Sequence, residues 1–205
     1  GRDVRRSALE TRRLEEAAPE VDHGGLCMVG LPEWLAGNVA LVCGTIFAAP
    51  GDPLNPRPKT YTNPEEAYRL GQAQLDYYHW LADVSEQVTL VTDRATLDAT
   101  WASWDTDRPR VGIVVLMEGA DPIRRPGEVE AWYERGVRMV GLAWRTGSAY
   151  AGGDGRPGRL TDAGRALLEG MAEVGMVLDV SHLDEEAYYE VLDRYEGPVV
   201  ASHAN

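Results

Sequence analysis

Short apolar runs alternate with amphipathic segments along most of this chain, and this alternation is the feature that most constrains the fold. Five runs have the length and composition of core strands, and they lie near residues 39–47, 111–117, 138–144, 176–181 and 199–202. Strands that alternate with helices are typical of βα units around a parallel sheet. We therefore predict an α/β fold with about five βα units.

Local signals support the same order of elements. Val111–Met117 is almost entirely apolar, as expected for a strand that is buried on both faces. A helix is predicted to begin at Asn63, which caps it, and to run to about residue 82. Further helices are predicted from Asp93, Gly127, Thr161 and Asp184, whereas Val88–Val91 is only a minor apolar run.

The segment from Arg145 to Arg159 is rich in glycine and is predicted to form a long loop. Long loops in compact domains are often functional. The segment lacks the GxxxxGK pattern of a phosphate-binding loop, so its glycines do not predict a nucleotide site.

Length and charge limit the possible classes. With 205 residues and 44% apolar content, the chain has the size of one domain, so residues 1–205 are assigned to one domain. Gly1 is an unusual start, and the chain stops directly after a strand-like run, which predicts a domain that is incomplete at both ends. A net charge of −13 argues against nucleic acid and anionic membranes as partners.

The two cysteines, Cys27 and Cys43, each lie in an apolar stretch, which suits buried thiols in a reducing compartment better than a disulfide framework. We therefore expect a cytoplasmic location, while a signal peptide ahead of Gly1 stays open. No stretch reaches the roughly 18 apolar residues of a membrane span.

Three of the predicted strands are followed by a residue that can bind a metal ion. Glu118 follows VVLM, His182 follows LDVS, and His203 follows VVAS. The carboxyl ends of parallel strands in a βα barrel meet on one face, so these side chains are expected to converge. Imidazole and carboxylate together suit Zn²⁺. A lone histidine at a strand end is more often structural, but three such residues on βα units favour a metal site.

Five segments carry motifs beyond the βα pattern, namely VVLMEG (114–119), GVRMVGLAW (136–144), LTDAG (160–164), GMVLDVSHL (175–183) and PVVASHAN (198–205). Together they resemble the membrane dipeptidases, also called renal dipeptidases, a family of zinc peptidases with an amidohydrolase-like barrel. The resemblance also includes a weaker match over residues 30–50. The resemblance implies a (β/α)8 TIM-type barrel, of which this chain contributes strands two to six.

The resemblance also implies a site and a reaction. Glu118 is expected to bridge two zinc ions and to be a catalytic residue, while His182 and His203 bind the second ion. A hydroxide between the ions would attack the peptide carbonyl of a dipeptide. Trp144 stands where mammalian relatives have a substrate-facing histidine, and Arg145 beside it is a candidate substrate donor. A homodimer is a further expectation.

Other parts of the family pattern are absent. The His-x-Asp pair of the first strand is expected before Gly1, because Asp22-His23-Gly24-Gly25 lacks the second acid and no strand precedes it. The proton-shuttling Asp and the Arg that holds the substrate carboxylate are expected beyond Asn205. We interpret His23 as unrelated to the metal site and His79 as a structural helix residue.

Two alternatives to a dipeptidase remain at this stage. One is a related metal-dependent amidohydrolase that acts on another amide or a lactam, because the barrel and its metals do not determine the substrate. The other is a catalytically silent barrel that serves as a binding module. A His-x-Asp pair and an acidic strand end outside this sequence would favour an enzyme.

Overall fold

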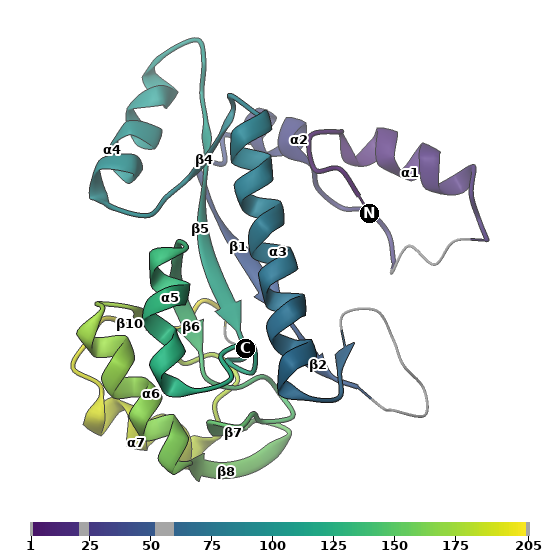
Figure 1. The fold of residues 1–205 in the computed structure, drawn as a ribbon. Coiled ribbons are helices and arrows are strands. Elements are labelled where there is room, and N and C mark those ends of the chain that lie inside the picture. The colour runs from purple at the N-terminus through teal and green to yellow at the C-terminus, as the bar shows by residue number, and fades with distance from the viewer. Residues whose placement is uncertain (1, 21–24, 52–59, 204–205) are drawn as a thin grey trace. The chain divides into compact units, whose positions relative to one another are not determined.

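The computed structural model describes residues 2–20, 25–51 and 60–203, which group into two compact units (Figure 1). One unit consists of Gly1–Val42 and Trp80–Ile113, and the other of Cys43–His79 and Val114–Asn205. His23 lies outside the described residues. Three elements contribute residues to both units, namely β1 (Leu41–Phe47), α3 (Pro64–Val84) and β5 (Val111–Glu118).

The first unit contains α1 (Ala8–Glu16), α2 (Leu31–Ala36), β4 (Val88–Leu90), α4 (Arg94–Ala102) and the 3-10 turn η1 (Ser103–Asp105). Its strand β4 pairs in parallel with the start of β5, where Val88 lies opposite Val111. The sequence of residues 88–91 indicates only a minor apolar run, so β4 is a strand beyond the five predicted. Three residues are too few to show a strand period, and the pairing with β5 makes them a strand.

The second unit contains the parallel ladder on which the predicted site depends. The sheet order is β1-β5-β6-β9-β10, with β6 at Val137–Gly141, β9 at Val177–Asp179 and β10 at Val199–Val200. The pairs β5–β6, β6–β9 and β9–β10 are parallel. Their register aligns the strand ends in one row, because Glu118 pairs with Gly141, Gly141 with Asp179, and Asp179 with Val200.

Helices follow these strands in the predicted order. They are α5 (Val129–Glu134), preceded by the 3-10 turn η2 (Pro126–Glu128), α6 (Asp162–Glu173) and α7 (Glu185–Arg194), and Figure 1 shows them beside strands β6 to β10. The Thr161 side chain caps α6, and the Asp184 side chain caps α7. The buried core of this unit includes Trp132, Leu167, Met171, Met176 and Leu178.

The glycine-rich segment is more ordered than predicted. Within it, β7 (Ala151–Gly153) and β8 (Arg156–Leu160) form an antiparallel pair where the sequence analysis expected a loop. A Cβ on Gly152 would lie 2.3 Å from the Gly158 carbonyl oxygen, so only glycine allows this close approach. Such backbone packing leaves no hydrophobic period in the sequence.

A shorter parallel pair joins β2 (Ala49–Pro50) to β3 (Thr60–Tyr61).

In the described chain, no helix is both long enough and apolar enough to cross a membrane. Cys27 and Cys43 are both free thiols. Cys27 is buried as predicted, but Cys43 is exposed, so the prediction of a buried thiol is wrong at Cys43. Cys43 lies in β1, where the residues of a strand alternate between the two faces of the sheet.

Candidate metal centre

Glu118 is the last residue of β5, and the chain turns directly after it. Gly119 has a φ of +84°, a region that glycine adopts readily and other residues rarely adopt. The Glu118 side chain, 21% exposed, therefore leaves the sheet at the carboxyl edge of the strand. Its neighbour in β6 is Gly141, which adds no side chain beside it.

His182 lies in a tight turn after β9, where the Leu183 amide donates to the Val180 carbonyl at 3.3 Å. Its φ of +63° is a left-handed conformation that costs a non-glycine residue about 1–2 kcal/mol. The β7–β8 hairpin supports this conformation, because the Asp154 amide donates to the His182 carbonyl at 2.9 Å. The Asp154 carboxylate lies 3.4 Å from His182 Nδ1. Because Nδ1 of His182 lies beside Asp154, its Nε2 atom points toward Glu118.

His203 follows β10 and brings its ring to 4.7 Å from the His182 ring, in an edge-on arrangement. Its Nδ1 lies 2.8 Å from the Ser202 hydroxyl. Its backbone amide donates to Ser181 Oγ at 3.2 Å. These two hydrogen bonds hold His203 against Ser202 and Ser181, which directly precede His203 and His182 in the sequence.

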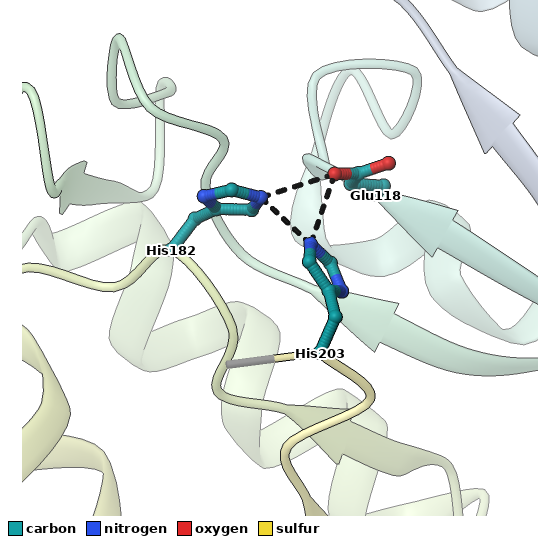
Figure 2. Close-up of side chains that lie close together, drawn as sticks. All are labelled: Glu118, His182 and His203. Atoms are coloured by element: carbon teal, nitrogen blue, oxygen red, sulfur yellow. Dashed lines mark hydrogen bonds and ion pairs between the residues drawn. The ribbon is translucent and has the colours of Figure 1, made fainter. Parts of the chain in front are cut away.

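Figure 2 shows Glu118, His182 and His203 turned toward one another. Glu118 Oε1 lies 3.2 Å from His182 Nε2 and 3.4 Å from His203 Nε2, and the two Nε2 atoms are 2.8 Å apart. Ligands about 2.0–2.1 Å from a tetrahedral Zn²⁺ are separated by about 3.3–3.4 Å. Two of the three separations therefore fit a shared cation. The shorter one is a hydrogen-bond distance, as expected when one ring carries the Nε2 proton.

The buried Asp179 carboxylate lies behind the histidines, with 1% of its surface exposed. Burial alone would raise its pKa, but hydrogen bonds from Ser202 and Ser181 lower the pKa of this carboxyl overall. Asp179 is therefore a carboxylate at neutral pH.

The two predicted substrate residues lie in different surroundings. The partly buried Trp144 ring packs edge-on against Phe47, with centroids 5.1 Å apart, and is 6.4 Å from the His182 ring. Arg145 is exposed, and its carbonyl accepts a hydrogen bond from Gly155. Among the described residues, no hydrogen bond or ion pair joins Arg145 to Glu118, His182 or His203. The structure thus brings Trp144, but not the Arg145 side chain, to the cluster.

A pocket of about 470 Å³ lies against both histidines, and its lining also includes Asp154 and Tyr188. This volume is in the range of small-molecule sites. His79 lies away from the pocket lining and contacts the Arg135 carbonyl through Nε2 at 2.8 Å, as expected for a structural residue.

Parallel strands that end in a carboxylate and two imidazoles form a candidate metal site of the kind that βα barrels carry at their carboxyl strand ends. The family model of the membrane dipeptidases (Peptidase family M19) matches residues 8–205. The chain therefore belongs to the membrane dipeptidase family, and the predicted resemblance is confirmed.

Two curated proteins are similar to the chain in sequence. The chain is 32% identical over 142 residues to "Uncharacterized protein in PQQ-III 3'region" of Acinetobacter calcoaceticus. That alignment covers 64% of this chain and 43% of the relative. The chain is also 27% identical over 147 residues to dipeptidase verJ of Clonostachys rogersoniana, in an alignment that covers 68% of this chain and 36% of the relative. The chain thus spans less than half the length of these two relatives.

A solved structure shows the fold. It is a metallopeptidase from Rhodobacter sphaeroides liganded with a phosphinate mimic of the dipeptide L-Ala-D-Ala. The match has a TM-score of 0.72 at 19% identity and covers 97% of this chain and 63% of that one. Together with the family match, this similarity confirms the predicted fold class, an α/β TIM-type barrel represented by some of its βα units.

Sequence reasoning missed the residues that support the cluster. Asp179, Ser181 and Ser202 form one hydrogen-bonded group, and Asp154 contacts His182 from the hairpin. One signal was present, because Asp179 is an acid at the end of the otherwise apolar strand VLD. A buried acid in a strand needs partners, and these come from the two turns that precede the histidines.

Proposed function

We propose that this chain carries half of a binuclear zinc site with which the full-length protein hydrolyses dipeptides. The observation that carries the proposal is the convergence of Glu118 Oε1 with the Nε2 atoms of His182 and His203, within 3.4 Å of one another. Membership of the membrane dipeptidase family supports metal-dependent peptide hydrolysis as the reaction. The name of dipeptidase verJ and the dipeptide mimic bound to the R. sphaeroides enzyme support dipeptides as substrates.

Glu118, His182 and His203 are the residues proposed to hold the metal. Both contacts of the carboxylate with the imidazoles use Oε1, which leaves Oε2 for a second ion. Two histidines and a carboxylate are a common zinc ligand set. Bound zinc acidifies water and polarises a carbonyl, which is the chemistry that amide hydrolysis needs.

The chain's own residues then position the substrate and the ligands. The Trp144 ring is proposed to form an apolar wall beside His182, against which a dipeptide side chain packs. Arg145 is exposed next to it and is proposed to donate to a substrate oxygen after a rotation of its flexible side chain. The β7–β8 hairpin holds the His182 backbone, so it contributes to the geometry of the proposed ligand.

Location and assembly complete the proposal. A reducing, cytoplasmic location is supported by the two free thiols Cys27 and Cys43. A homodimer is proposed on the family resemblance and is tested by light scattering of the full-length protein.

The test uses the full-length protein that contains these residues, stripped of metal and reloaded with Zn²⁺. Dipeptide hydrolysis should disappear on stripping and return with zinc. His182→Ala and His203→Ala should each lower zinc content and abolish hydrolysis, while His79→Ala serves as the matched control and keeps both. A zinc-loaded protein that hydrolyses an unrelated amide but no dipeptide would replace the proposed substrate. A protein with no zinc-dependent hydrolysis of any kind would reject the proposal.

A further inference from the structure

The Asp179 carboxylate joins the two turns that carry the histidines. Its Oδ1 accepts from the Ser181 amide at 3.1 Å, from Ser181 Oγ at 2.7 Å and from the Ser202 amide at 3.0 Å. Its Oδ2 accepts from Ser202 Oγ at 2.5 Å. Four donors from two loops on one buried carboxylate hold the ends of β9 and β10 in a fixed relation.

The contact of Asp179 with Ser202 decides which nitrogen of His203 carries the proton. A hydroxyl has one hydrogen, and a carboxylate only accepts, so Ser202 Oγ donates its hydrogen to Asp179. The same oxygen lies 2.8 Å from His203 Nδ1 and must therefore accept there. His203 thus carries its proton on Nδ1 in the neutral form. Its Nε2 is then free of a proton and faces Glu118 and His182.

We propose that Asp179 is a positioning residue that fixes the tautomer of His203 through the Ser202 hydroxyl and thereby presents Nε2 as a metal ligand. The tautomer assignment stands on the hydrogen bonds alone, while its use in metal binding rests on the proposed function. Outer contacts of this kind orient metal-binding imidazoles and typically change metal affinity by about 10–100-fold when removed.

Asp179→Asn separates this role from a merely structural one. The amide oxygen can replace Oδ1 and keep the three donors from Ser181 and the Ser202 amide. The amide NH₂ then faces Ser202 Oγ and donates to it, so the hydroxyl hydrogen turns toward His203 Nδ1. The fold keeps most of its hydrogen bonds, but the proton of His203 is expected to move to Nε2.

The experiment records long-range ¹H–¹⁵N correlations of the imidazole rings in the metal-free full-length protein, at a pH well above the ordinary histidine pKa of about 6.5. The wild type should show His203 with the proton on Nδ1, and Asp179→Asn should show it on Nε2. Ser202→Ala removes the intermediate hydroxyl and should leave a mixture of tautomers. Asp193→Asn, an exposed acid on α7, is the matched control and should leave the spectrum unchanged.

Zinc affinity, measured by competition with a chromophoric chelator, is the second readout. It should fall about 10–100-fold in Asp179→Asn and stay at the wild-type value in Asp193→Asn. If Asp179→Asn does not fold, Ser202→Ala carries the same two measurements, because it keeps the contacts of Asp179 with Ser181. Either foldable variant with the wild-type tautomer and wild-type zinc affinity would overturn the positioning role.

Failure of the proposed function would look different. A tautomer that shifts as expected, in a protein without zinc-dependent hydrolysis, supports the positioning role and rejects the dipeptidase proposal. An active dipeptidase whose His203 tautomer does not depend on Asp179 or Ser202 supports the function and rejects the positioning role.

Discussion

Gly119 allows a direct test of the turn that places Glu118. Substituting Gly119 changes the energy of the backbone conformation without creating a steric clash. In Gly119→Ala the new Cβ would have no atom closer than the Trp144 backbone nitrogen at 3.6 Å, which is ordinary contact. The whole cost therefore comes from the φ of +84°. A left-handed conformation costs an alanine about 1–2 kcal/mol, so the free energy of unfolding should fall by that amount. Urea unfolding followed by tryptophan fluorescence measures it.

Two other glycines provide the comparison. Gly127 has an ordinary φ and open space around the position of a Cβ, so Gly127→Ala should be neutral or stabilise by up to about 1 kcal/mol. A Cβ on Gly153 would lie 2.1 Å from the Trp144 carbonyl oxygen, and Gly153→Ala should cost about 3 kcal/mol because the backbone must move. A Gly119→Ala protein as stable as Gly127→Ala would refute the reasoning.

Three further outcomes are expected. Glu190→Gln should lower the free energy of unfolding, measured in urea, by about 1–2 kcal/mol. The buried Glu190 carboxylate forms ion pairs with three arginines, Arg159, Arg165 and Arg194. Because the arginines are partly exposed to water, each ion pair contributes little by itself. Hydrogen bonds lower the pKa of Asp179 below its ordinary 3.8, so its contribution to stability should be complete above about pH 5 and lost as the pH falls through the lowered pKa. Urea midpoints from pH 6 to 2 should therefore show a shallower acid decline in Asp179→Asn. Trp144→Ala should raise the KM for a dipeptide and keep zinc content, and an unchanged KM would remove Trp144 from the substrate site.

Much of the fold is predictable because its signals are local. β5 is a run of apolar residues whose first seven are all buried, and the caps Thr161 and Asp184 mark the starts of α6 and α7. The convergence of Glu118, His182 and His203 is predictable too, because parallel order alone brings carboxyl strand ends together.

The parts that escaped prediction depend on contacts between distant segments. β4 is a strand because it pairs with β5, and the β7–β8 hairpin forms because glycines let two backbones approach. The hydrogen bonds between Asp179 and Ser202 join residues 23 positions apart, so no local pattern predicts them. The positive φ of His182 is likewise a result of the turn and the hairpin that surround it.

Anomalous diffraction at the zinc absorption edge, from crystals of the full-length protein grown with Zn²⁺, is the sharpest test of the proposed metal site. An anomalous peak is expected about 2.0–2.2 Å from Nε2 of His182, from Nε2 of His203 and from a carboxylate oxygen of Glu118. Crystals that contain zinc bound only by other residues, with no peak between these three side chains, would contradict it.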